Sequence, residues 1–162
     1  NRSPHQPDHF RLFKPQRPAL LFKGAQAFFV SIMQLTRQLA LFLGNEPGAL
    51  ARMCRALADA KINLFALSVG DTVDHCVVRV VTSDWQRAKQ TFEEHNVVSV
   101  ETEVLMIEAT NQPGTLALIA EKLAVAKINI EYAYFATGQN AKEGLLILRT
   151  SNSRKALKIL NT

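Results

Sequence analysis

The stretch NEPGALARMCRALADAKINL, residues 45–64, decides the fold, because the chain repeats it as NQPGTLALIAEKLAVAKINI at residues 111–130. The two windows are identical at eleven of twenty positions without a gap. Similarity at a fixed offset is the signature of an internal repeat of one supersecondary unit. The chain from Met33 onward is therefore predicted to contain two copies of the same structural unit.

Each copy opens with a strand, a turn and a helix. An apolar run short enough to be a strand precedes each turn, at residues 39–44 and 104–110. Apolar residues then recur at i, i+3, i+4, i+7 and i+8, which predicts one buried helical face. The predicted face comprises Leu50, Met53, Cys54, Leu57 and Ala58 in the first copy and Leu116, Ile119, Ala120, Leu123 and Ala124 in the second.

The remainder of each copy completes the order βαββαβ. After a second strand that begins at each Lys-Ile-Asn, third strands are predicted at residues 75–82 and 143–150, and Asp84 is predicted to cap the next helix. Residues 97–101 supply the last strand of the first copy. The second copy is predicted to lack this strand, since only two residues follow its last helix. Its first strand, 104–110, would then have an unpaired edge, which favours association between the two units or between chains as a homodimer.

The predicted fold class is α+β, because a βαββαβ unit folds as a ferredoxin-like antiparallel sheet with its helices on one face. The predicted domains are a first unit over residues 33–102 and a second unit over residues 103–162. Residues 1–32 contain four prolines and no sustained periodicity, so we expect a disordered or non-native tail. A basic docking tail is the alternative.

Composition argues against several classes of function. Four of the five net positive charges fall in the tail, so the remaining chain is nearly neutral and gives no support to nucleic-acid or membrane binding. No apolar run approaches the roughly 20 residues that a membrane-spanning helix needs. Two cysteines without CxxC spacing favour a reduced, cytoplasmic protein. His75 and Cys76 are adjacent on a predicted strand and point to opposite faces, so we expect no metal site, and we expect no cofactor.

The repeated motif resembles the ACT domain, a regulatory module of amino-acid metabolism. The resemblance rests on a strand followed by Asn-x-Pro-Gly-x-Leu, an amphipathic helix and Ile-Asn, and it covers residues 35–160. Two such units with little else are similar to the stand-alone tandem ACT proteins of bacteria, which carry no catalytic domain. The resemblance implies a non-enzymatic, allosteric protein that reversibly binds an amino acid where ACT units pair.

The turn itself supports a site for a zwitterion. A helix N-terminus favours a carboxylate, a glycine allows close approach to the backbone, and an asparagine amide offers both donor and acceptor atoms. By resemblance, the ligand-binding positions are Asn45, Gly48, Ala49, Leu50 and Asn63 in the first unit, and Asn111, Gly114, Thr115, Leu116 and Asn129 in the second. Some serine-binding members have a His where this chain has Leu43 and Ala109, so an apolar amino acid is favoured over serine.

Two alternatives stay open at this level. The asparagines can instead serve structure alone, with Asn45 and Asn111 as helix caps or turn residues and Asn63 and Asn129 in left-handed turns that end helices. The protein can also be a regulatory subunit that docks on a biosynthetic enzyme, similar to the small subunit of acetolactate synthase. An RNA-binding sheet is disfavoured. Such a sheet needs aromatic residues on its central strands, and the strands predicted here offer only Phe42.

Overall fold

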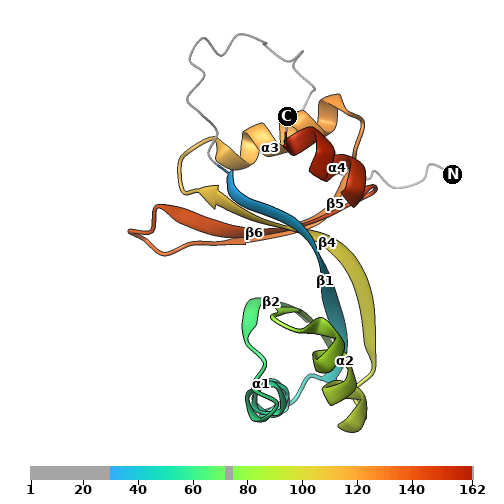
Figure 1. Ribbon diagram of the computed structural model, residues 1–162. Coiled ribbons are helices and arrows are strands. Elements are labelled where there is room, and N and C mark those ends of the chain that lie inside the picture. Colours follow the sequence, from blue (N-terminus) through green and yellow to red (C-terminus); the bar gives the residue numbers. More distant parts are fainter. Residues whose placement is uncertain (1–29, 72–74, 162) are drawn as a thin grey trace, which may run out of the picture.

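The computed structural model describes residues 30–71 and 75–161, and they form six strands and four helices (Figure 1). The first half comprises β1 (Val30–Gly44), α1 (Ala49–Asp59), β2 (Leu64–Asp71), β3 (His75–Thr82) and α2 (Trp85–Glu94). The second half comprises β4 (Ser99–Thr110), α3 (Thr115–Val125), β5 (Ile130–Ala136), β6 (Glu143–Thr150) and α4 (Ser153–Leu160). The predicted tail lies outside the described residues, except that 30–32 belong to β1.

All six strands form one antiparallel sheet in the order β2-β3-β1-β4-β6-β5. The two central strands are long and belong to both units. The second half of β1 pairs with β3, from Gln38 to Gly44, whereas β4 pairs along β1 from Val30 to Leu41. Each unit is therefore a four-stranded βαββαβ sheet, as predicted, but the two units share β1 and β4.

The prediction of an unpaired edge in the second unit is wrong. The position of its final strand, beside β4, is occupied by the first half of β1, in which Met33 pairs with Ile107 and Leu35 with Leu105. The other side of β4 pairs with β6. Local sequence could not reveal this arrangement, because the strand segment that completes the second unit lies at the start of the stretch predicted as the first unit. The outer strands of the sheet are β2 and β5.

Both helix pairs pack on the same face of this sheet. Leu39 and Leu41 of β1 contact the core beneath α1 and α2, and Met33 and Leu35 of the same strand contact the core beneath α3 and α4. These residues are separated by even numbers, so their side chains share one face. Figure 1 shows the two helix pairs at opposite ends of an elongated molecule, because the twist of the long strands rotates one half against the other.

The predicted helical faces are only partly confirmed. Met53 and Leu57 of α1 and Ile119 and Leu123 of α3 are buried. However, Leu50, Cys54 and Ala58 of α1 and Leu116 and Ala124 of α3 are exposed, and Ala120 is half-buried. In the first helical turn, the buried residue is instead Ala49 in α1 and Thr115 in α3. The true stripe is thus shifted by one residue, because alanines fit the periodic pattern on either side of the helix.

The helix ends follow local chemistry closely. The Asp84 side chain accepts a hydrogen bond from the Arg87 backbone N–H at 3.0 Å, which confirms the predicted cap of α2. At the C-termini of α1 and α3, Lys61 and Lys127 adopt positive φ values of 57° and 56°. The next N–H, from Ile62 in the first unit, donates to the Leu57 carbonyl at 2.9 Å, which completes a Schellman motif.

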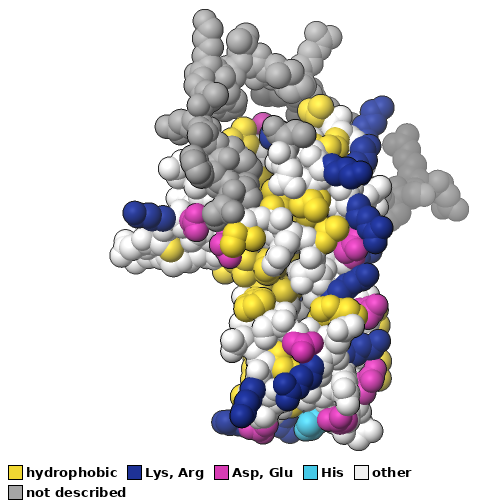
Figure 2. Space-filling view, viewed as in Figure 1, with side chains coloured by type: hydrophobic (Ala, Val, Ile, Leu, Met, Phe, Trp, Pro, Cys, Tyr) yellow, Lys and Arg dark blue, Asp and Glu magenta, His cyan; other side chains and the backbone are white. Residues whose placement is uncertain are grey.

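The opposite face of the sheet has a smaller core of its own. Val81 of β3, Val104 and Met106 of β4 and Ile147 of β6 form a buried cluster there. Figure 2 shows hydrophobic side chains gathered at the level where the two units meet. No helix among the described residues is long and apolar enough to cross a membrane.

Candidate functional site

The two Asn-x-Pro-Gly turns have the same backbone geometry. Each helix starts directly after its glycine, and Gly48 and Gly114 have φ values of 86° and 95°. This left-handed conformation is strained for any residue with a Cβ, which explains the glycine at both positions. The interpretation of Asn45 and Asn111 as helix caps is wrong, since the caps are the glycines and neither helix has a side-chain cap.

Asn111 connects the second turn to the loop between β5 and β6 through two hydrogen bonds. Its Nδ2 donates to the carbonyl of Ala141 at 3.1 Å, and its backbone N–H donates to the carbonyl of Lys142 at 2.8 Å. The interpretation of this residue as a turn support is therefore correct. Because the contact uses the amide nitrogen, the Oδ1 atom keeps acceptor capacity for a ligand.

A cavity of about 150 Å³ opens at the second turn, between the N-terminus of α3 and the strands β4, β5 and β6. Four residues predicted for the site line it, namely Asn111, Gly114, Thr115 and Leu116. Sequence reasoning used Ala109 to argue which ligand is favoured, but it missed the lining residues Thr110, Gln112, Ala117, Ile119, Phe135 and Leu146. The structure thus builds a pocket around the predicted turn from four separate elements.

Two threonine hydroxyls meet at this pocket. Thr110 is the last residue of β4 and Thr115 the first of α3, and their Oγ1 atoms are 3.2 Å apart. The side chain of Thr115 is buried, and that of Thr110 is half-buried. A hydroxyl both donates and accepts, so the pair can offer hydrogen bonds to a polar ligand group without adding charge.

Phe135 of β5 forms one wall of the pocket and depends on a glycine in the next strand. A Cβ on Gly144 of β6 would collide with the Phe135 ring, with the ring Cε2 only 2.6 Å away. The missing side chain therefore makes room for the ring against the sheet. No sequence signal near the turn identifies Phe135, because its position depends on the pairing between β5 and β6.

Asn63 and Asn129 lie at the other end of their helices, away from the turns. Each follows the C-terminus of its helix, whereas the turn precedes the N-terminus, and an eleven-residue helix spans about 16 Å. Their left-handed interpretation is wrong, since Lys61 and Lys127 hold that conformation. Instead, the Asn129 backbone exchanges hydrogen bonds with Ser151, and the Asn63 backbone with Ser83 in the same way. Within one unit, the structure does not bring these residues to the turn.

The side chains that line the pocket carry no charge. Its lining contains no Asp, Glu, Lys, Arg or His. Across the residues that the structure describes, no group of three or more His, Cys, Asp or Glu side chains could hold a metal ion. The arrangement can therefore bind a small uncharged or zwitterionic molecule through backbone groups, hydroxyls and an amide.

A family model for the ACT domain pair matches residues 33–161. The chain therefore belongs to the ACT domain pair family, a class of regulatory modules. Among solved structures, protein BT0572 from Bacteroides thetaiotaomicron is similar at 29% identity and a TM-score of 0.74, over 80% of this chain and 88% of that one. No curated protein matches the chain.

Two further solved structures share the fold. They are the regulatory subunits of aspartate kinase from Thermus thermophilus, in its ligand-free form, and from Thermus flavus. Their identities to this chain are 17% and 19%, with TM-scores of 0.61 and 0.56. The similarity covers 82% of this chain and 97% and 96% of theirs. At these identities, the likeness supports the tandem ACT architecture alone.

Proposed function

We propose that this protein is a non-catalytic regulator that binds a free amino acid in the pocket at the second turn. The observation that carries the proposal is the cavity of about 150 Å³ at the N-terminus of α3. An engineered protein cavity of about this volume accepts benzene. The pocket is thus of the right size for a small or medium amino-acid side chain.

The carboxylate of the ligand is assigned to the start of α3. A helix leaves its first N–H groups without partners inside the helix, and its dipole favours negative charge at that end. The backbone of Gly114 is approachable, because a Cβ placed there would meet no atom within 4 Å. Leu116 and Ala117, in the same helical turn, also line the pocket.

The ammonium group is assigned to the neutral acceptors around the turn. The neutral side-chain acceptors that line the cavity are the hydroxyls of Thr110 and Thr115 and the amide oxygens of Asn111 and Gln112. A ligand side chain with its own charge would find no partner of opposite sign in the lining, and an unpaired charge is costly to bury. We therefore propose an amino acid with an uncharged, mainly apolar side chain.

The regulated target is proposed to be another protein of amino-acid metabolism. The solved structures named above include regulatory subunits of aspartate kinase, which supports a regulatory role for this chain but names no target. We place the protein in the cytoplasm, where its free thiols, Cys54 and Cys76, stay reduced.

A second candidate function is that of a subunit docked permanently on a biosynthetic enzyme. It is favoured by an uncovered apolar area on the face of the first unit that carries no helices, where Phe42, Val98 and Val100 are exposed. Replacing Phe42 with Asp would abolish co-purification with such an enzyme but leave amino-acid binding intact. Co-purification that survives Phe42→Asp would show that this apolar area does not hold the enzyme.

The proposal is tested by thermal unfolding of the full chain with each of the twenty amino acids. A ligand that binds only the folded state adds about 2.7 kcal/mol at a hundredfold excess over its dissociation constant. We expect such stabilisation from one or a few amino acids with uncharged side chains, and none from Lys, Arg, Asp or Glu. The absence of any stabilisation across the set would overturn the proposal.

A further inference from the structure

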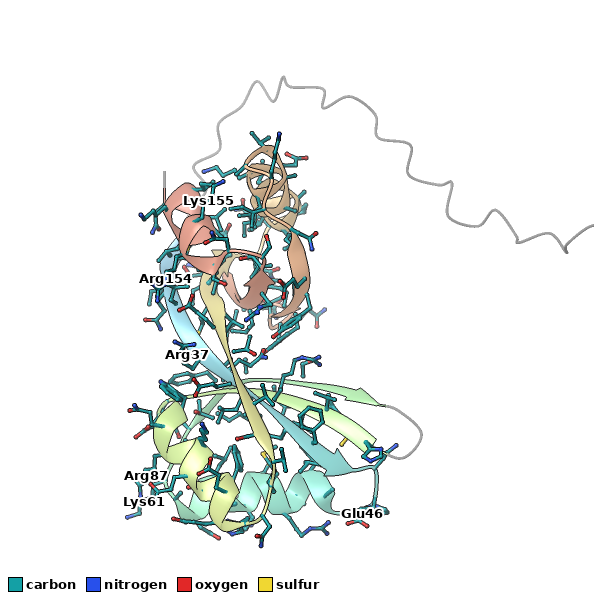
Figure 3. The ribbon with its side chains drawn as sticks, turned by 90° about the vertical axis from the view of Figure 1, so that its right-hand side faces the viewer. Arg37, Glu46, Lys61, Arg87, Arg154 and Lys155 are labelled. Carbon is teal, nitrogen blue, oxygen red and sulfur yellow. The ribbon has the colours of Figure 1, made fainter. Side chains whose placement is uncertain are left out.

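The two turns share a sequence motif but differ in what surrounds it. In the first unit, Glu46 of the turn forms an ion pair with Arg52 of α1. The equivalent residues of the second unit are Gln112 and Leu118, which carry no charge. The ion pair therefore belongs to the first turn alone. Figure 3 shows Glu46 at the turn between β1 and α1.

This ion pair occupies the space that is open in the second unit. The Arg52 Nη1 atom lies 3.3 Å from the position that a Cβ on Gly48 would take. A Cβ placed on Gly114 would have no atom within 4 Å. The guanidinium of Arg52 thus lies against the start of α1, where the second unit leaves the backbone of its glycine accessible.

The surrounding residues also make the first turn a less favourable binding site for a ligand. Where the second unit has Ala109 at the floor of its cavity, the first unit has the larger Leu43, which is buried in the core. The hydroxyl pair of Thr110 and Thr115 is replaced by Gly44 and an alanine. The first turn therefore combines a larger apolar side chain with the loss of two hydrogen-bonding groups.

We infer that the second turn is the ligand site of the chain and that the first turn is filled by its own Glu46–Arg52 ion pair. This inference rests on the proposed function. A guanidinium at a helix N-terminus opposes the helix dipole, and the Glu46 carboxylate compensates for it. The side chains are 66% exposed for Arg52 and 62% for Glu46, so the pair contributes little to stability and can be removed without unfolding the unit.

The inference is tested by labelling the full chain with ¹⁵N-glycine, which gives at most seven amide signals, and adding an equimolar mixture of amino acids with uncharged side chains. We expect the Gly114 signal to shift and the Gly48 signal to remain in place. Shifts of both signals, or of Gly48 alone, would overturn the inference while supporting amino-acid binding. If neither signal shifts, the proposed function fails, and the inference fails with it.

A set of variants tests the role of the ion pair directly. Glu46→Gln with Arg52→Leu copies the second turn, and adding Leu43→Ala copies its floor. We expect the Gly48 signal to respond to the same mixture in the triple variant, with the stoichiometry rising from one ligand per chain toward two. The matched control is Arg55→Leu, which removes a charge from the same helix and should leave Gly48 unresponsive. A Gly48 signal that stays unresponsive in both the double and the triple variant would contradict the assigned role of the ion pair.

Discussion

The guanidinium carbon of Arg79 in β3 lies 5.0 Å from the ring centroid of Tyr132 in β5, although three strands separate β3 from β5 in the sheet. In a flat sheet these strands would be about 19 Å apart. The sheet is therefore curled, which brings β3 and β5 toward each other on the face without helices. Gln38, at the middle of β1, bridges the same region, since its Nε2 donates to the Tyr132 hydroxyl at 2.7 Å.

This contact links the pocket to the first unit. Phe135 lines the pocket on the helix-bearing face of β5, and Tyr134, the preceding residue, points to the opposite face. The Tyr134 hydroxyl donates to Gln38 Oε1 at 3.1 Å. One face of β5 thus lines the pocket, and the other contacts the shared strand β1.

Tyr134 makes the stability of the protein sensitive to alkaline pH. Burial, with a smaller contribution from neighbouring Tyr132, raises the pKa of Tyr134 above its ordinary value of 10.0. A raised folded-state pKa stabilises the fold fully below pH 10, and this stabilisation is lost as the pH rises through the folded-state value. We expect the unfolding free energy to fall less steeply above pH 10 in Tyr134→Phe than in the unmodified chain.

The matched control for this measurement is Tyr132→Phe, which removes the other tyrosine of the chain. At neutral pH, Tyr134→Phe should cost about 1 kcal/mol, because Gln38 loses one hydrogen bond. Urea unfolding between pH 7 and 11 measures both effects. Parallel pH profiles for Tyr134→Phe and the unmodified chain would show that the hydroxyl is not held in its neutral form.

Because β1 is shared, a residue in its first half, within the segment predicted as the first unit, should stabilise the second unit. Leu35 of β1 packs against the core beneath α3 and α4. Replacing it with Ala should cost about 2 kcal/mol, at the low end for a core leucine because the side chain is half-buried. Hydrogen exchange should accelerate more in α3 and α4 than in α1 and α2. Gln34→Ala, on the opposite face and exposed, is the control, and equal effects of both changes would refute strand sharing.

Gly144 is predicted to be essential for the wall of the pocket. Gly144→Ala should displace the Phe135 ring and destabilise the fold by roughly 1–3 kcal/mol, the usual cost of overpacking. Gly138→Ala is the matched control, because its Cβ would lie at an ordinary 3.6 Å from Ala141. Chemical denaturation and the fluorine spectrum of fluorophenylalanine-labelled protein report the two effects. A ring environment unchanged by Gly144→Ala would show that Phe135 is not held in this way.

Sequence patterns predicted the local structure well, because local chemistry determines it. The repeated turn identified both units, and Asp84 identified a helix start. The patterns did not predict which strand completes the second unit, since nothing within β1 marks its pairing with β4. The exposure of Cys54 was also missed, because the residues of an alanine-rich helix fit two adjacent faces equally well.

Sequence patterns predicted the part of the pocket that the turn forms, but not the part that the strands form. Helix chemistry indicated Gly114, the resemblance to ACT domains indicated Thr115, and both line the cavity. Phe135 and Leu146 reach it only through the register of the β5–β6 pairing, which depends on contacts between residues distant in the sequence. The difference between the two turns likewise became visible only when Arg52 was located over Gly48.

Calorimetric titration of Ala117→Leu tests the central claim most directly. Ala117 lines the cavity from an exposed position on α3, so a leucine there should narrow the pocket without disturbing the core. The equivalent change in the first unit is Ala51→Leu, at an exposed position on α1. With the amino acid that stabilises the protein most, we expect Ala117→Leu to weaken binding at least about tenfold, or about 1.4 kcal/mol, and Ala51→Leu to leave it unchanged. Unaltered affinity in Ala117→Leu would contradict the assignment of the ligand to the second turn.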